Sequence, residues 1–258
     1  MIYTGFDSAD YPGDTKMQSI WDNTELRWCG FYLGLTSAWH PHFPKLQDIG
    51  WGVAPIYTGK NPGSHKLQAI HNKHAGHPAA LFNALWDNGA LVDGNEAADQ
   101  ARAANIPLNT ILYFDVENAV PDADWLAYYR GWSRAVTDRN YRVGLYTRRE
   151  HASWLMGKLM GRDSLTRPFD ICVPNIWIAR YNRANPNGGS IPSKDFLAEP
   201  LPAPDPKSVY SSASVWQHIG NFGLKWTDDS GRNHTFAPVD FDSSTYPDPG
   251  LGFLSTIT

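Results

Sequence analysis

Short apolar segments alternate with segments of helical composition along nearly the whole chain, and this alternation constrains the fold more than any other feature. Eight runs have the length and character of buried β-strands: 2–7, 30–33, 52–57, 110–115, 142–146, 175–179, 214–217 and 239–242. Helices are predicted between several of them, at about 16–26, 67–74, 79–88, 95–105, 122–139 and 149–160. Because strands that alternate with helices pair in parallel, the sequence predicts an α/β protein with a closed (β/α)8 TIM barrel. The last two strands are poorly matched with helices, so an irregular barrel is expected.

The chain length agrees with one barrel. At 258 residues with 42% apolar residues, the chain matches the roughly 250 residues of such barrels. We expect a single domain over 1–258 with loop insertions after strands three and six, at about 58–94 and 182–212. The first insertion is rich in histidine and carries helical pieces, and the second contains six prolines. Both follow strands, so both are expected on the face where barrel loops build sites.

Charge and hydropathy exclude several classes of partner. The net charge is −4, the pI is about 6.1 and no long basic run is present, which argues against nucleic-acid binding. No segment has the roughly 18 uninterrupted apolar residues of a membrane helix, so no membrane contact is expected. The N-terminal residues also lack the basic and apolar regions of a signal peptide. The localisation stays open, with action outside the cell or at its envelope expected if the chain is trimmed or exported by another route.

The fourth apolar run ends in two carboxylates, Asp115 and Glu117, within Ile-Leu-Tyr-Phe-Asp-Val-Glu-Asn. Side chains alternate along a strand, so both acids point the same way while Val116 points the other. Cleavage of a glycosidic bond uses a proton donor beside a second carboxylate, and this pair is typical of such a site. The alternative is a strand end that meets solvent or binds loop amides.

Polar and aromatic side chains also lie in or near the last residues of the other runs, namely Asp7, Tyr57, Tyr146, Trp177, Tyr181, Gln217, Asp240 and Asp242. Because the carboxyl ends of parallel barrel strands meet on one rim, the acids among them are expected to share one mouth. Crowded carboxylates raise one another's pKa, so one can stay protonated near neutral pH and act as a general acid. Asp242 shares the face of Asp240 and is expected to hold the terminal turn.

Five segments carry a family resemblance: Gly-Phe-Asp-Ser-Ala-Asp at 5–10, Trp-Gly-Val-Ala-Pro-Ile-Tyr at 51–57, Asp-Gly-Asn-Glu-Ala-Ala at 93–98, Ile-Leu-Tyr-Phe-Asp-Val-Glu at 111–117 and Tyr-Arg-Val-Gly-Leu-Tyr at 141–146. With them, the chain resembles the glycoside-hydrolase-like barrels first catalogued as domain of unknown function 1906. That group is similar in turn to the glycoside hydrolase family 25 lysozymes. The resemblance runs from about 3 to 246, and its most specific parts are Gly-Phe-Asp, Asp-Val-Glu and the late Trp-Gln followed by Val-Asp.

The resemblance implies roles for individual residues. Glu117 would donate a proton to the glycosidic oxygen, and Asp115 would stabilise the 2-acetamido group or the developing positive charge. Asp7 and Asp240 would line the subsite beside the scissile bond. The implied reaction is hydrolysis of a β-1,4 bond of peptidoglycan, retaining and assisted by the substrate's own acetamido group. The sugar cleft would be shaped by Tyr57, Tyr146, Trp177, Tyr181 and Gln217.

Histidines and cysteines offer competing sites. His71, His74 and His77 recur every three residues near His65, a spacing that can bind zinc from one helix face. Helix-breaking residues interrupt that segment and no acid or cysteine is adjacent, so we predict a solvated loop and neither a metal nor a cofactor. His40 and His42 are weaker candidates for substrate contact. Cys29 and Cys172 precede strands on opposite sides of the ring, so their α-carbons should exceed the roughly 7 Å limit of a disulfide.

The sequence thus favours a lysozyme-like glycoside hydrolase that cleaves a β-linked N-acetylated glycan, above all peptidoglycan, with Glu117 as general acid. The alternative is a catalytically inactive module on the same barrel that binds carbohydrate or the cell envelope. A weaker third hypothesis is a hydrolase assisted by a metal at the histidine segment. The sequence leaves the oligomeric state open, with a monomer as the default.

Overall fold

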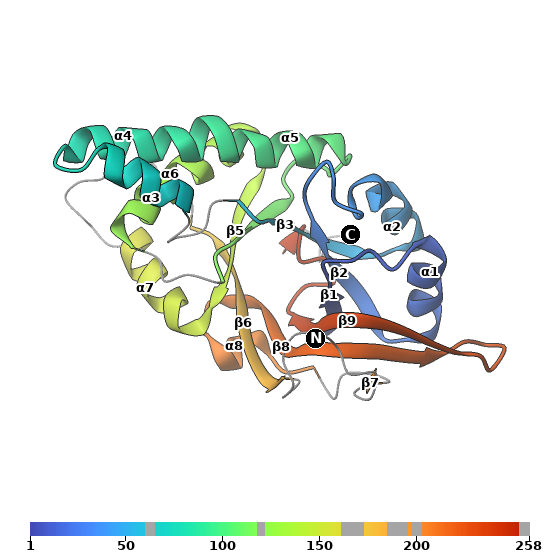
Figure 1. Cartoon of the computed structure of the whole chain (residues 1–258). Coiled ribbons are helices and arrows are strands. Elements are labelled where there is room, and N and C mark those ends of the chain that lie inside the picture. The colour runs from blue at the N-terminus through green and yellow to red at the C-terminus, as the bar shows by residue number, and fades with distance from the viewer. Residues whose placement is uncertain (60–64, 118–121, 161–172, 185–195, 198–202, 253–258) are drawn as a thin grey trace.

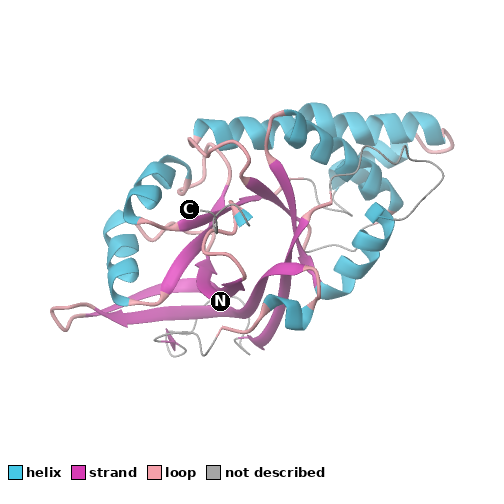
Figure 2. Ribbon diagram, turned by 180° about the vertical axis from the view of Figure 1, so that it is seen from behind, coloured by secondary structure: helices cyan, strands magenta, loops and turns pink. Residues whose placement is uncertain are grey.

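A closed eight-stranded barrel with helices around it forms the framework of the protein (Figures 1 and 2). The computed structural model describes residues 1–59, 65–117, 122–160, 173–184, 196–197 and 203–252. Around the ring the order is β1-β2-β3-β4-β5-β6-β8-β9, and β9 returns to β1. The predicted α/β barrel is therefore confirmed.

The strands and helices follow the predicted order. The strands are β1 Tyr3–Asp7, β2 Leu26–Tyr32, β3 Gly52–Tyr57, β4 Ile111–Asp115, β5 Arg142–Arg148, β6 Asn175–Ala184, β7 Phe196–Leu197, β8 Ala213–Thr227 and β9 Asn233–Ser244. The helices are α1 Asp14–Asn23, α2 Phe43–Ile49, α3 His65–Lys73, α4 Pro78–Asp87, α5 Asn95–Ala103, α6 Ala123–Asp138, α7 Arg149–Met160 and α8 Pro206–Val209. A short 3-10 turn, η1, covers His40–His42, and a π-helical segment, η2, covers Asn88–Gly94. Among the described helices, none is long and apolar enough to cross a membrane.

The sheet is mixed, which corrects the expectation of wholly parallel strands. β1 to β6 and β8 pair in parallel, whereas β9 runs antiparallel to both of its neighbours. A tight turn joins β8 to β9, in which Asp228 Oδ1 accepts hydrogen bonds from the backbone N–H groups of Ser230 and Arg232. Such a turn joins only antiparallel strands, because a parallel pair needs a long crossover. The two strands are also longer than predicted, at 15 and 12 residues, and project beyond the ring (Figure 1).

The alternation of side chains along each strand separates two layers. Large apolar residues on the outer face, such as Leu112 and Phe114, pack under the helices. The inner face holds a second apolar cluster of Trp28, Ala54, Ile56, Ile111, Tyr113, Tyr146, Trp177, Ala179 and Val215. Gly30 leaves space for the Asp7 side chain above this cluster. A Cβ at position 30 would lie only 2.5 Å from the Cβ of Asp7.

The two predicted insertions differ from simple loops. The first forms α3, α4 and η2, and α4 continues through η2 into α5 as one long helical rod (Figure 1). Helices were expected at 67–74 and 79–88, and both are present. The second insertion includes the end of β6, β7 and α8, while 185–195 and 198–202 lie outside the described residues.

Candidate active site

The predicted acids gather at one end of the barrel. Asp7 and Asp115 end β1 and β4, and Glu117 follows two residues later. Asp240 lies on β9 directly opposite Asp7, and Asp242 lies one inward-facing position deeper, opposite Gly5. Because β9 is antiparallel and extends past the rim, Asp240 reaches the rim from within its strand and not from its end. The acids meet as predicted, but for a different topological reason.

Gln217 links the acids and one tyrosine. Its Nε2 donates hydrogen bonds to Asp7 Oδ2 at 2.7 Å and to Asp240 Oδ2 at 2.9 Å. Its Oε1 accepts a hydrogen bond from the Tyr146 hydroxyl at 2.7 Å. Gln217 is fully buried, so these contacts fix the amide in one orientation. Four of the predicted site residues are thereby connected within one network.

Further donors surround Asp7 and Asp240. The Tyr32 hydroxyl donates to Asp7 Oδ1 at 3.0 Å, and the Tyr181 hydroxyl donates to Asp240 Oδ2 at 3.4 Å. The backbone N–H of Asn221 donates to Asp240 Oδ1 at 2.5 Å. Asn221 has a left-handed φ of 59° where the β8–β9 pairing is irregular. This local irregularity directs the N–H group at the carboxylate.

Asp242 and Trp177 form the floor beneath the acids. Both are fully buried, and the Trp177 indole N–H donates to Asp242 Oδ1 at 3.1 Å. The Trp177 ring makes edge contacts with Trp28, Tyr113 and Tyr146. Trp177 was expected to offer a face for a sugar, but its burial within the barrel makes it a support under the site. Asp242 was expected to hold the terminal turn and instead lies within the acid group.

Asp115 and Glu117 are held together by the backbone. The N–H of Glu117 donates to Asp115 Oδ1 at 3.0 Å. Val116 is fully buried in the outer layer, so the predicted opposition of Val116 to the two acids is observed. Glu117, Asp115 and Asp240 are half-buried, whereas Asp7 is 2% exposed. The three half-buried acids are thus the ones that can meet a ligand.

Burial and mutual repulsion shift the acids toward their protonated forms. Burial, followed by the charge of Asp240, raises the pKa of Asp7 to about 8. Burial raises the pKa of Asp240 to about 6 against the opposing hydrogen bonds from Asn221 and Tyr181, and it raises the pKa of Asp242 well above its ordinary value. The pKa of Glu117 is raised by burial and then by the charge of Asp115, while Arg148 and Tyr146 oppose the shift. The group therefore offers both protonated and ionised carboxyls near neutral pH.

Tyr57 lies apart from this group. It belongs to the outer layer, where its ring lies 6.2 Å from that of Phe114 and 6.3 Å from that of Trp132. Its hydroxyl donates to Glu96 Oε2 at 3.1 Å. Ala54 and Ile56 are the residues of β3 that face the barrel interior, so Tyr57 points at the helices. The expectation that Tyr57 shapes the sugar cleft disagrees with this orientation.

Two of the histidines proposed as alternative sites, His42 and His71, contact nearby carboxylates. His42 Nδ1 lies 2.8 Å from Asp14 Oδ1, and its ring stacks on Tyr11 with centroids 4.1 Å apart. His71 Nε2 lies 3.4 Å from Asp124 Oδ2. In the described part of the chain, no three His, Cys, Asp or Glu residues are arranged to hold a metal. Cys29 is a buried free thiol, and Cys172 lies outside the described residues.

The sequence reasoning missed Tyr32 and Asn221. A signal for Tyr32 exists, because it lies two residues after Gly30 on the same strand and therefore shares the inward face. No comparable signal marks Asn221, since its contribution is a backbone N–H presented by an irregular strand. Arg148, which lowers the pKa of Glu117, lies two residues after Tyr146 and follows the same alternation.

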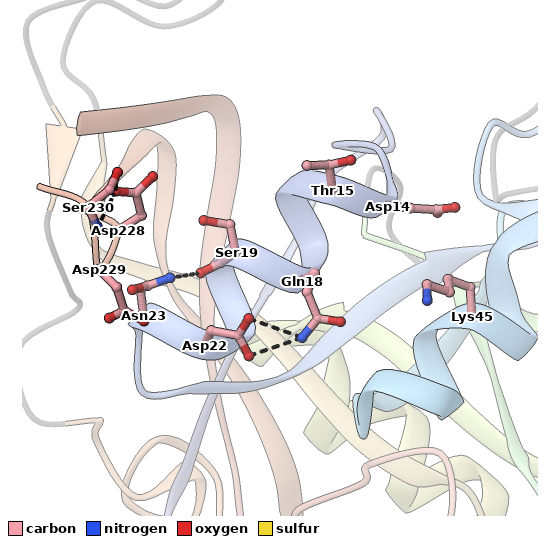
Figure 3. A pocket seen from close by; sticks show the side chains of 10 residues that line it. All are labelled: Asp14, Thr15, Gln18, Ser19, Asp22, Asn23, Lys45, Asp228, Asp229 and Ser230. Atoms are coloured by element: carbon pink, nitrogen blue, oxygen red, sulfur yellow. Dashed lines mark hydrogen bonds between the residues drawn. The ribbon is translucent and has the colours of Figure 1, made fainter. Parts of the chain in front are cut away.

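A separate cavity of about 580 Å³ lies outside the barrel, between α1 and the tip of the β8–β9 hairpin (Figure 3). Three of its acidic side chains have partners: Asp14 accepts from the Tyr11 hydroxyl, Asp22 from Gln18, and Asp228 from Ser230. The Asn23 amide likewise donates to the Ser19 carbonyl. The cavity shares no lining residue with the acid group at the barrel mouth. This cavity is therefore not the candidate active site.

Comparisons with known proteins agree with a glycoside-hydrolase-like barrel. A family model described as "Rv2525c-like, glycoside hydrolase-like domain" matches residues 20–229. An uncharacterized protein of B. stearothermophilus superposes with a TM-score of 0.54 at 20% identity over 93% of this chain and 94% of that chain. The Tat-secreted protein Rv2525c of Mycobacterium tuberculosis, in complex with L-tartrate, gives a TM-score of 0.53 at 13% identity over 96% and 98%. No significant match exists among curated proteins.

Proposed function

Because the chain belongs to the Rv2525c-like, glycoside hydrolase-like domain family, we propose that it hydrolyses a glycan through the acid group at the barrel mouth. The observation that supports this most strongly is the pairing of half-buried Glu117 with Asp115 on one side and Asp240 with Asp7 on the other. The favoured substrate is a β-linked N-acetylated glycan such as peptidoglycan, which the resemblance to family 25 lysozymes implies. In this proposal the protein acts at the cell envelope or outside the cell.

Glu117 is the proposed general acid. It is accessible from the mouth, and burial together with the charge of Asp115 raises its pKa, which favours the protonated form required for proton donation. The proton passes to the glycosidic oxygen as the bond to the anomeric carbon breaks. The acetamido oxygen of the substrate closes on that carbon, and water then opens the intermediate while Glu117 takes back a proton.

Asp240 and Asp115 stabilise the positive charge that develops on the sugar. Asp240 accepts hydrogen bonds from Gln217, Tyr181 and Asn221, and these donors favour its ionised form. Asp115 lies next to Glu117 and orients the acetamido group. Asp7 and Asp242 are more fully buried than the other acids and hold protons, which limits the negative charge of the site.

Replacement of Glu117 by glutamine tests the proposal directly. The amide keeps the size of the side chain but cannot donate the proton, so we expect release of soluble muropeptides from purified peptidoglycan to fall by about 10²–10⁴-fold. Glu25→Gln is the matched control, because Glu25 is 82% exposed and lies immediately before β2, at the end of this strand away from the acids. It should retain full activity.

Equal release by wild type and Glu117→Gln would refute the role of Glu117. If neither protein releases fragments but both bind chitin or peptidoglycan oligomers by calorimetry, the protein is a binding module that has kept the barrel. Metal analysis of the protein before and after chelation tests the third hypothesis, that of metal assistance.

A further inference from the structure

Tyr146 joins Glu117 to the acids on the other side of the mouth. It pairs with Asp115 across β4 and β5, and its backbone carbonyl accepts a hydrogen bond at 2.8 Å from Val116, the residue between Asp115 and Glu117. Its hydroxyl donates to Gln217 Oε1 at 2.7 Å and is also hydrogen-bonded to the Glu117 side chain. One tyrosine therefore contacts both the proposed general acid and the amide that binds the other acids.

The Tyr146 hydroxyl has one proton for two acceptors. Its side chain is 4% exposed, and burial, followed by the charges of Asp7 and Glu117, raises its pKa well above the ordinary value, so the phenol stays protonated. A phenol donates one hydrogen bond and accepts others through its oxygen. When Tyr146 donates to Gln217, a hydrogen bond with Glu117 requires a proton on Glu117. When Glu117 is ionised, the Tyr146 proton has to point at Glu117.

The amide of Gln217 makes these two arrangements exclusive. Both protons of its Nε2 are used, one by Asp7 Oδ2 at 2.7 Å and one by Asp240 Oδ2 at 2.9 Å. A flip of the amide would turn its oxygen toward two carboxylates, so Oε1 stays directed at Tyr146. Because Gln217 is fully buried, its oxygen is shielded from solvent. Gln217 and Glu117 therefore compete for the one proton of Tyr146.

Other titratable groups face this contact from several strands. Asp115, Asp240 and Arg148 act on Glu117 through their charge, whereas Tyr146 acts through a hydrogen bond. The groups that face Glu117 or Tyr146 are Asp7 of β1, Tyr32 of β2, Asp115 of β4, Arg148 of β5, Tyr181 of β6 and Asp240 of β9. A change in the direction of one hydrogen bond thus takes place among fixed charges, and its effect on Glu117 can be measured separately from theirs.

We propose that Tyr146 is a positioning residue whose hydroxyl donates to Gln217 while Glu117 is protonated and turns to Glu117 once this acid has given its proton away. The inference rests on the proposed function for the step in which the Glu117 proton passes to the glycosidic oxygen. Tyr146 keeps its own proton throughout, so only the direction of its hydrogen bond changes. A hydrogen bond to a carboxylate is stronger than one to a neutral amide, so the turn stabilises Glu117 directly after proton donation.

Carboxyl NMR titration of Glu117 without substrate tests this switch. Tyr146→Phe removes the donor to the ionised acid, so we expect the pKa of Glu117 to rise by roughly 1. Gln217→Met removes the competing acceptor and leaves the hydroxyl free for Glu117, so the pKa of Glu117 should fall. Gln217→Met also removes donors from Asp7 and Asp240. The same change in the Tyr146→Phe background measures that effect alone, and the fall should be smaller there.

Tyr141→Phe is the matched control. The buried Tyr141 hydroxyl donates to the Ile106 carbonyl at 3.1 Å, directly before β5 and at the end of this strand away from the acids. Its loss should lower the melting temperature without changing the pKa of Glu117. If Gln217→Met does not fold, the comparison of Tyr146→Phe with Tyr141→Phe still decides whether the hydroxyl acts on Glu117.

An unchanged or lowered pKa of Glu117 in Tyr146→Phe would overturn the proposal. An equal fall caused by Gln217→Met with and without the Tyr146 hydroxyl would also overturn it. If the titrations follow the expected pattern but the wild-type protein releases no muropeptides, the proposed function fails while the switch remains.

Discussion

At the scale of single residues, the site depends on groups that donate hydrogen bonds to carboxylates. Gln217 joins Asp7 and Asp240 to Tyr146, because a neutral amide donates through nitrogen and accepts through oxygen. A glutamate at this position would place another negative charge among buried acids. Asn221 adds a backbone N–H that no change of side chain removes directly, yet the position of this donor depends on the left-handed backbone at residue 221.

We expect Asn221→Gly to keep the function of this backbone donor and Asn221→Val to lose it. Glycine adopts positive φ without strain, whereas a β-branched residue strongly disfavours it. Loss of the N–H contact should raise the pKa of Asp240 above its value of about 6, and the acid limb of the pH–activity profile should move to higher pH by roughly half to one unit. Carboxyl NMR titration of Asp240 measures the same shift without activity. Identical titration curves for the two variants would contradict this role.

At the scale of elements, helix contacts hold the segment between β3 and β4 against the barrel. η2 and α4 lie directly on α6, and glycines permit contact between backbones. A Cβ on Gly131 would lie 2.2 Å from the Trp86 carbonyl oxygen, and a Cβ on Gly89 would lie 2.0 Å from the Tyr128 carbonyl oxygen. The first insertion is thus part of the packed helical layer.

Gly131→Ala should destabilise the protein by about 1–3 kcal/mol, because neither α4 nor α6 can yield without moving its backbone. The midpoint of chemical denaturation measures this change. Gly157→Ala is the matched control on α7, since nothing lies within 4 Å of a Cβ there. In an exposed helix it should stabilise the protein by about 0.5–1 kcal/mol. A neutral effect of Gly131→Ala would show that the two helices are not tightly packed.

At the scale of the whole molecule, the barrel buries acids at a cost in stability. In the unfolded chain Asp7 and Asp240 have the ordinary aspartate pKa of 3.8. In the folded protein the pKa of Asp7 is about 8 and that of Asp240 is about 6. Between these values the folded protein holds protons that the unfolded chain has released. The contribution of these groups to stability is therefore greatest below pH 3.8 and is lost as the pH rises toward 8.

Asp242→Asn should remove part of this cost. The amide oxygen can still accept the Trp177 N–H, and the group no longer ionises in the unfolded chain. We expect the variant to be more stable than wild type by about 1 kcal/mol at pH 8, or roughly 2–4 °C in Tm, with no gain at pH 4. Asp22→Asn, an exposed carboxylate of α1, should show no such difference between the two pH values. A larger gain at pH 4 than at pH 8 would contradict the sign of this argument.

Regular local patterns made much of this molecule predictable. Period-two runs and intervening helices predict the strand order and the α/β class, since both depend on side chains a few residues apart. The same periodicity places Asp7, Asp115 and Gln217 on inward faces. Sequence similarity further identifies the family, because Gly-Phe-Asp and Asp-Val-Glu are local motifs.

Only the tertiary structure decided which atoms meet. The antiparallel course of β9 places Asp240 opposite Asp7, and the irregularity at Asn221 supplies a donor that composition cannot reveal. Trp177 is buried beneath the acids and Tyr57 points toward the helices, although the sequence predicted that both would shape the sugar cleft. The physical reason is that orientation at a strand end, desolvation and pKa depend on neighbours that are distant in sequence, and these exist only once the ring has closed.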